Sequence, residues 1–219
     1  GMKVVLEDGS SFGVLKDVME TGANDVYIVK TNDGKDVDPS VAQDLEYVKT
    51  IGKRIKDAGA NFVLDFHYSD TWVDAGHIQA SEAWKSMSTA EKTAQIGKYT
   101  KECLNALTEA GAKPDMVQVG NEIMYGFMGI KVAPYESTGS DWDGFLSVLK
   151  AGCAAVRESC PEAKIIIHTD RPSNADYANY WYGKLDATGI DYDIIGLSYY
   201  PFWHGTLNDL KMGLDNLKS

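Results

Sequence analysis

The sequence predicts an α/β fold in which helices alternate with parallel strands. Short apolar stretches rich in β-branched residues alternate about five times with stretches of helical periodicity. The central strand, residues 115–122, is apolar at first and ends in Gly120, Asn121 and Glu122. Polar and aromatic residues also follow most of the other strands. Such residues at the ends of several strands are typical of the catalytic face of a β/α barrel.

The first part of the chain is expected to contain two helices separated by a strand. Residues 11–20 predict a helix, and a short strand follows at residues 26–29 before the turn sequence of residues 31–34. Asp38, followed by proline, is the expected N-cap of a helix that closes at Gly59. The first helix is expected from its single apolar face, which comprises Val14, Leu15, Val18 and Met19.

The middle of the chain is expected to hold two buried strands. Residues 61–67 predict the first of them, and residues 88–91 form a capping box that opens a long helix. Gly111 ends this helix. The central strand, residues 115–122, follows, and residues 123–141 form a long loop with glycines and aromatics.

The last part of the chain continues the alternation. A helix ended by Pro161 is followed by a strand at residues 164–169. A helix at residues 175–187 and a strand at residues 193–200 come next, and a last helix starts near Thr206.

Composition excludes several classes of partner. The 219 residues are 44% hydrophobic, which is ample for one sizeable core. A net charge of −11 argues against nucleic acid and anionic membranes as partners. No stretch approaches the ~20 apolar residues of a membrane span. Cys103, Cys153 and Cys160 are expected to be packing residues, and without a tight His/Cys cluster no metal site is expected.

The sequence gives less support to two other α/β proteins, a nucleotide-binding sheet and an aldolase or isomerase barrel. The glycine-rich phosphate loops of nucleotide-binding sheets, Gly-x-Gly-x-x-Gly and Gly-x-x-x-x-Gly-Lys-Ser/Thr, are absent. An aldolase or isomerase barrel would need a lysine or a phosphate site at a strand end. Lys30 and Arg171 are the basic candidates, and neither lies in a glycine-rich context.

The residues at the strand ends suit sugar chemistry. Glu122 beside Asn121 could protonate a glycosidic oxygen, although a glutamate here could also stabilise a helix start. Aromatic rings could stack on sugars or simply pack, and each histidine could be structural. Asp65 could be a buried acceptor that orients a neighbour. The candidate substrate-binding residues are Asp65, His67, Trp72, Asn121, His168, Tyr199, Tyr200, Trp203 and His204.

Three segments carry a resemblance to a known family. Residues 64–72 (LDFHYSDTW), 114–122 (PDMVQVGNE) and 195–205 (IGLSYYPFWHG) resemble glycoside hydrolase family 53, and the likeness runs from about residue 10 onward. These enzymes are endo-β-1,4-galactanases that cut the galactan side chains of pectin. The resemblance implies a retaining (β/α)8 TIM barrel with Glu122 as the general acid/base. It also implies that the candidate binding residues line the subsites around the cleaved bond.

The chain departs from the family pattern at both ends. The resemblance implies one barrel-type domain over residues 1–219 that lacks the first strand and the last two β/α units, leaving about five parallel units. The nucleophilic glutamate of the family follows a strand that this chain does not contain. Asp65 and Asp170 have no support as substitutes, so the isolated chain is expected to be nearly inactive. A non-catalytic carbohydrate-binding relative, or an inactive fragment, is therefore the alternative.

The same resemblance sets the expected partners. The substrate is expected to be a polysaccharide or oligosaccharide, with no cofactor, no nucleic acid and no membrane. Self-association is possible because an incomplete barrel leaves open sheet edges. A polymeric substrate implies a secreted, cell-surface or periplasmic protein, although the chain carries no signal peptide.

Overall fold

The computed structural model describes residues 3–5, 11–20, 25–31, 44–133, 139–170 and 175–217. By its internal contacts the chain divides into two compact units, residues 1–47 and 48–219, and each is described by itself. The prediction of a single barrel-type domain over residues 1–219 stays a prediction.

The N-terminal unit contains an antiparallel sheet. Strands β1 (Lys3–Val5), β2 (Ser11–Glu20) and β3 (Asp25–Thr31) pair in the order β1-β2-β3. The helix predicted for residues 11–20 is therefore wrong. Only four residues separate β2 from β3, so the two can pair as a hairpin. The register shifts between Leu15 and Asp17, and such a bulge interrupts the alternation by which a strand is recognised.

The strand predicted at residues 26–29 is confirmed as β3, but its place in the fold differs from the prediction. It pairs antiparallel with β2 and does not join the parallel sheet. The parallel sheet of the described residues therefore has four strands and not about five. The predicted N-cap at Asp38 and the basic candidate Arg171 lie outside the described residues.

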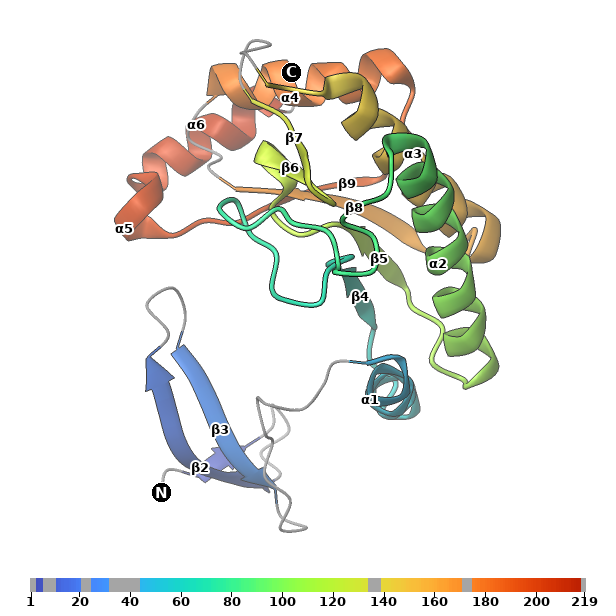
Figure 1. The fold of residues 1–219 in the computed structure, drawn as a ribbon. Coiled ribbons are helices and arrows are strands. Elements are labelled where there is room, and N and C mark those ends of the chain that lie inside the picture. Colours follow the sequence, from blue (N-terminus) through green and yellow to red (C-terminus); the bar gives the residue numbers. More distant parts are fainter. Residues whose placement is uncertain are drawn as a thin grey trace. The chain divides into compact units, whose positions relative to one another are not determined.

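The larger unit is built on a four-stranded parallel sheet (Figure 1). Its strands are β4 (Val63–Phe66), β5 (Met116–Val119), β8 (Lys164–Thr169) and β9 (Ile194–Leu197), in the order β4-β5-β8-β9. Successive strands are neighbours, as in a β/α barrel. The predicted fold class, a partial barrel of parallel β/α units, is confirmed.

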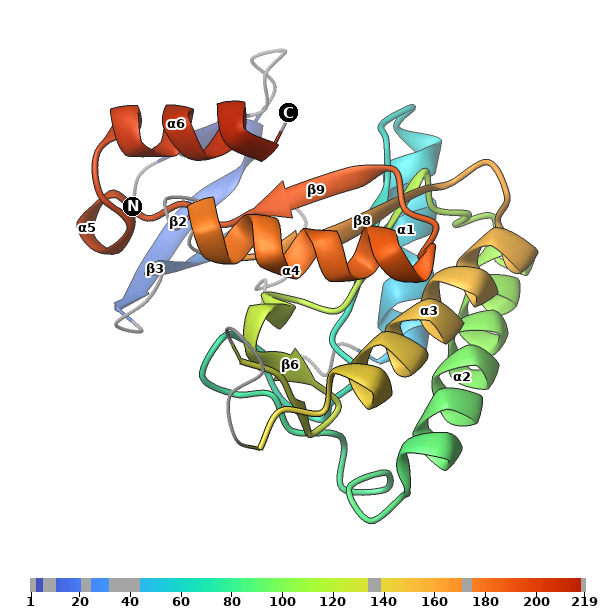
Figure 2. The same ribbon diagram turned by 90° about the horizontal axis from the view of Figure 1, so that it is seen from above.

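Helices accompany these strands. They are α1 (Leu45–Asp57), α2 (Thr89–Glu109), α3 (Trp142–Ser159), α4 (Ala175–Thr188), α5 (Pro201–His204) and α6 (Leu207–Leu217). Three of them, α2, α3 and α4, lie between successive strands of the sheet. Helix α2 packs against α3, and α4 packs against α6 (Figure 2). The short helix α5 was not predicted. The connection after β5 contains a 3-10 turn, η1 (Ile123–Tyr125), and a small ribbon of β6 (Gly126–Phe127) and β7 (Ile130–Lys131).

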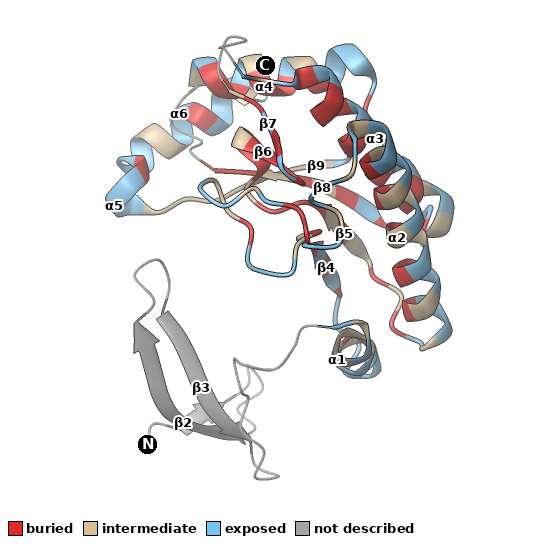
Figure 3. Ribbon diagram, in the orientation of Figure 1, coloured by how far each residue is buried: buried red, intermediate tan, exposed pale blue. Residues whose placement is uncertain are grey.

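The core lies between the sheet and its helices, where Figure 3 shows buried residues along α3 and α4. Val117 and Val119 are fully buried, while the alternate residues Met116 and Gln118 are half-buried. A Cβ on Gly152 of α3 would lie 2.8 Å from Val119, so glycine lets this helix approach the sheet closely. The other face of the sheet carries both apolar and polar side chains, among them Asp65, Gln118 and His168. Cys103, Cys153 and Cys160 are buried and unpaired, as predicted for packing residues.

No helix in the described ranges is long and apolar enough to cross a bilayer.

Candidate functional site

The predicted site residues lie at one edge of the parallel sheet. Since all four strands run in the same direction, their C-terminal ends meet at this edge. Asp65 and His67 come from the end of β4, Asn121 and Glu122 follow β5, and His168 ends β8. The structure brings these five residues together. Nδ1 of His168 lies 2.9 Å from Oδ1 of Asn121 and 3.4 Å from the backbone nitrogen of Glu122, and Nε2 of His67 lies 3.3 Å from Oδ2 of Asp65. The carboxylates of Asp65 and Glu122 both influence the pKa of His168.

Asn121 is held by hydrogen bonds at both ends of its amide. It is only 8% exposed. Its Nδ2 donates to the carbonyl oxygen of Val73 at 2.7 Å. Its Oδ1 lies 2.9 Å from Nδ1 of His168 and accepts a bond from Nε2 of Gln118 at 3.2 Å. The orientation of the Asn121 side chain is thus determined by the protein itself.

Glu122 has an unusual backbone conformation. Its φ and ψ are both 47°, in the left-handed region that non-glycine residues rarely adopt. Such strain persists only where surrounding contacts impose it, and it clusters at functional sites. Ile123 and Met124 are fully buried, and the hydroxyl of Tyr177 donates to the Met124 carbonyl at 2.8 Å. The chain after Glu122 is therefore anchored, and the half-exposed Glu122 follows the end of β5.

Gly120 makes this turn possible. Its φ is 86°, and a Cβ there would lie 2.6 Å from Cγ2 of Ile123. Any other residue would be strained in its backbone and would clash with a fully buried side chain. The Gly-Asn-Glu sequence at the end of β5 thus has a structural requirement at its first position.

His67 is oriented by the loop that follows β4. Its Nδ1 accepts a hydrogen bond from the backbone N–H of Val73 at 2.9 Å. Its Nε2 lies 3.3 Å from Oδ2 of Asp65. The ring of Trp72 lies beside it, with 5.3 Å between ring centroids, and Trp72 is 64% exposed. His67 and Asp65 form one pair, and Trp72 presents an aromatic face to solvent.

His168 has a second partner that the sequence reasoning missed. Its Nε2 lies 2.9 Å from the hydroxyl oxygen of Ser198, at the end of β9. Burial lowers the pKa of His168, although the nearby carboxylates of Glu122 and Asp65 act in the opposite direction. The ring is therefore neutral at pH 7. The sequence offered one signal for this contact, a hydroxyl residue directly before Tyr199. Gln118, which donates to Asn121, was also missed, and its signal was an amide three residues before Asn121.

The aromatic residues after β9 form a separate group around α5. The hydroxyl of Tyr199 donates to the Gly205 carbonyl at 2.8 Å, and the Tyr200 N–H donates to Nδ1 of His204 at 3.2 Å. His204 is 8% exposed, whereas Trp203 is 78% exposed. His204 thus serves the local fold through its Nδ1, and Trp203 presents a large aromatic face.

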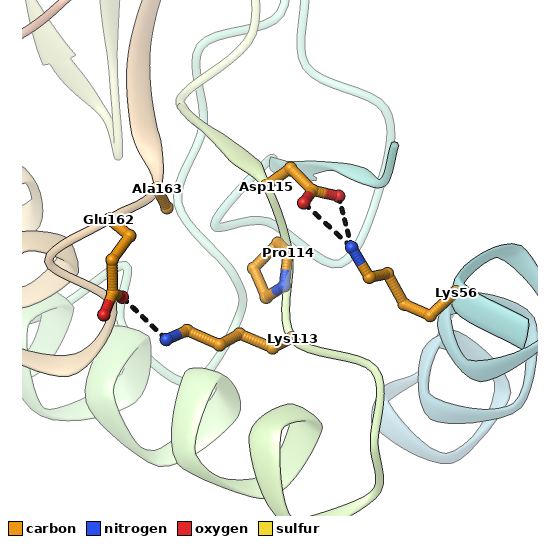
Figure 4. Close-up of a pocket in the computed structure, with 6 residues that line it drawn as sticks. All are labelled: Lys56, Lys113, Pro114, Asp115, Glu162 and Ala163. Carbon is orange, nitrogen blue, oxygen red and sulfur yellow. Dashed lines mark hydrogen bonds and ion pairs between the residues drawn. The ribbon is translucent and has the colours of Figure 1, made fainter. Parts of the chain in front are cut away.

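The opposite edge of the sheet contains a hollow of a different kind (Figure 4). It is lined by two ion pairs, Lys56 with Asp115 and Lys113 with Glu162, each at 2.7 Å, together with Pro114 and Ala163. These residues lie at the start of the strands, where barrel residues serve stability and not catalysis. Within the described ranges, no group of three or more His, Cys, Asp or Glu side chains could hold a metal ion.

Comparison with known proteins adds independent evidence. The family model described as Glycosyl hydrolase family 53 matches residues 7–219. A protein of Niallia circulans, named only as an uncharacterized protein in the bgaB 5' region, is 42% identical over 176 residues, covering 79% of this chain and 48% of that protein. The endo-beta-1,4-galactanase of Bacillus subtilis (strain 168) is 35% identical over 167 residues, covering 76% of this chain and 37% of that protein.

A solved structure agrees in fold. The GH53 catalytic domain of Ignisphaera aggregans matches with a TM-score of 0.72 and 34% identity, over 79% of this chain and 46% of that chain. The present chain thus spans about half the length, or less, of these relatives.

Proposed function

Because the chain belongs to glycosyl hydrolase family 53, we propose that it forms part of an endo-hydrolase of β-1,4-galactan, with Glu122 as the general acid/base. The observation that carries this proposal is the geometry at the end of β5. There the half-exposed Glu122 has a strained left-handed backbone. It directly follows Asn121, whose amide oxygen and nitrogen are both hydrogen-bonded within the protein. The galactanase names of the relatives support the choice of substrate.

The proposed chemistry is that of a retaining glycosidase. Glu122 protonates the glycosidic oxygen as the bond to the leaving sugar breaks, and then takes a proton from the water that releases the product. A second carboxylate must attack the sugar from the opposite face, about 5–5.5 Å from the first. We assign this nucleophile to no residue of the chain. Asp65 already faces His67, and Asp170 is only 4% exposed.

The predicted binding residues are proposed to border the bound galactan. The exposed rings of Trp72 and Trp203 suit stacking on sugar faces. The other residues that we propose to border the bound galactan are Asp65, His67, Asn121, His168, Tyr199, Tyr200 and His204.

A second candidate function is galactan binding without hydrolysis. It is favoured by the exposed rings of Trp72 and Trp203, since stacking on sugars needs no catalytic carboxylate. The other proposed partners follow from charge and substrate. A polymeric substrate favours a secreted, cell-surface or periplasmic protein. The net charge of −11 disfavours nucleic acid and anionic membranes. The two edges of the parallel sheet, which have no strand partner in the described ranges, favour self-association.

The test is the release of reducing ends from β-1,4-galactan. The chain, its Glu122→Gln variant and a Glu102→Gln control, on the exposed face of α2, are compared. Because the nucleophile is assigned to no residue of the chain, the rate of the chain itself is expected to be low. We expect Glu122→Gln to lose about 100-fold or more of that rate, with no change in the control. An aryl galactoside with an acidic leaving group needs little protonation, so its cleavage should suffer much less.

The outcomes separate the two candidates. Equal and measurable rates of sugar release by the chain and Glu122→Gln would contradict the role of Glu122. If neither releases sugar and both still bind galacto-oligosaccharides, the binding function replaces the hydrolase.

A further inference from the structure

His168 uses both ring nitrogens for contacts inside the protein. Nδ1 lies 2.9 Å from Oδ1 of Asn121, and Nε2 lies 2.9 Å from the hydroxyl of Ser198. We propose that His168 is a positioning residue: its neutral ring, with the proton on Nδ1, holds the Asn121 side chain, and through Asn121 it fixes the neighbouring Glu122. It borders the substrate without bonding to it. This inference rests on the proposed function only in its kinetic test.

The location of the proton follows from Asn121. A carbonyl oxygen can only accept hydrogen bonds, so the group that meets the Val73 carbonyl at 2.7 Å must be the nitrogen of the Asn121 amide. Its oxygen therefore faces Nδ1 of His168. Two acceptors at 2.9 Å would repel each other, so Nδ1 carries the proton and donates it. In the neutral ring Nε2 is then an acceptor, and the Ser198 hydroxyl donates to it.

The same reasoning gives His67 the opposite tautomer. The backbone N–H of Val73 donates to Nδ1 of His67, so this nitrogen is unprotonated. The proton of the neutral ring is then on Nε2, which lies 3.3 Å from the Asp65 carboxylate. The two backbone polar groups of Val73 thus bond in succession: its carbonyl oxygen accepts from Asn121 and its N–H donates to His67.

These contacts form one chain of polar groups across the ends of all four parallel strands. The four hydrogen bonds from Ser198 to His67 all donate in the same direction, from β9 toward β4, and Nε2 of His67 then lies 3.3 Å from the Asp65 carboxylate. Chains of aligned hydrogen bonds polarise and strengthen one another. The members, in order, are Ser198, His168, Asn121, Val73, His67 and Asp65.

The alternative tautomer of His168 would bond differently. With its proton on Nε2, Nδ1 could accept from the backbone N–H of Glu122, which lies 3.4 Å away. That contact is longer than the one to Asn121, and it would leave the Asn121 oxygen facing a lone pair. The tautomer of His168 therefore decides whether the ring holds the Asn121 side chain or the Glu122 backbone.

Nitrogen-15 NMR of the histidine side chains tests this without any activity. The chain has four histidines, so single substitutions assign every signal. At pH 7 we expect His168 with its proton on Nδ1, and His67 with its proton on Nε2. His204, whose Nδ1 accepts from the Tyr200 N–H, provides an internal reference for the Nε2–H form. A His168 ring protonated on Nε2 would overturn the proposal.

Two substitutions at position 168 separate positioning from substrate contact. In His168→Asn the amide nitrogen can occupy the place of Nδ1, whereas in His168→Gln it reaches the place of Nε2. We expect the Gln variant to lose about tenfold or more in kcat on galactan with little change in KM, because a displaced acid mainly slows the chemical step. The Asn variant should recover most of this loss.

The result distinguishes the possible roles. A raised KM in both variants, with kcat preserved, would make His168 a substrate ligand and overturn the positioning role. If the chain releases no sugar, the expected tautomers would still support the inference while the proposed hydrolase fails.

Discussion

Asp193 connects two strands of the sheet through one carboxylate. It accepts the backbone N–H of Ile165 at 2.9 Å, and it pairs with Arg157 at 2.6 Å and with Lys164 at 3.0 Å. Partial burial works to raise the pKa of Asp193, but these three donors prevail and lower it to about 2. The carboxylate, which is 20% exposed, therefore favours the folded state while it is charged.

Asp193→Ala is expected to reduce the free energy of unfolding by about 2 kcal/mol at pH 7, because the charged partners and the Ile165 N–H lose their acceptor. Asp191→Ala is the matched control, since Asp191 also pairs with Arg157 but is 67% exposed. It should cost about 0.5 kcal/mol or less. Urea unfolding measures both. Equal losses would contradict the special role of Asp193.

The pH dependence of this difference has a defined sign. The pKa of Asp193 is lower in the folded state than the ordinary value of 3.8. Its stabilising contribution is therefore complete above 3.8 and declines as the pH falls from 3.8 toward about 2.

At the scale of single residues, the sequence predicted what depends on residue type but not what depends on orientation. Glu122 and Asn121 were recognisable, because a polar pair ends an apolar strand. Ser198 was not, since a serine becomes a partner of His168 only when β8 and β9 lie side by side. Proton positions on histidine likewise depend on groups that are distant in the sequence, such as Val73 for His67.

At the scale of elements, the helices whose ends are marked locally were predicted best. The capping box of α2 is present as the sequence indicated, with the Ser88 hydroxyl accepting from the Glu91 N–H and the Glu91 carboxylate accepting from the Ser88 N–H. The strand β2 was missed because its pairing with β3 contains a bulge that interrupts the alternation of a strand. Local periodicity alone does not separate such a strand from a short helix.

Ser88→Ala is expected to lower the free energy of unfolding by about 1 kcal/mol, because the first turn of α2 loses an acceptor for its backbone N–H groups. Ser86→Ala, at an exposed position two residues earlier, serves as the control and should lie within about 0.5 kcal/mol of the parent. Thermal unfolding followed by circular dichroism compares the three proteins. A loss in both variants would mean that the effect is not capping.

At the scale of the whole molecule, the alternation of strands and helices predicted the order of the parallel sheet. It did not predict that β3 belongs to an antiparallel sheet, because a short apolar strand shows no direction in its sequence. Among the described strands, β4 pairs only with β5, and β9 only with β8. The parallel sheet therefore has two edges whose backbone groups have no strand partner in the described ranges.

Such edges favour pairing between copies of the chain. Val63 lies on the edge strand β4 and is 49% exposed, so a second copy could cover both its side chain and the edge.

Light scattering is expected to give a mass above 24.0 kDa that rises with protein concentration. Val63→Lys should lower that mass, because a charge at a strand edge opposes pairing. Ala83→Lys adds the same charge at an exposed loop position and should leave the mass unchanged. A constant monomer mass in the parent chain would contradict edge pairing, and an equal fall in both variants would make net charge, rather than the β4 edge, its cause.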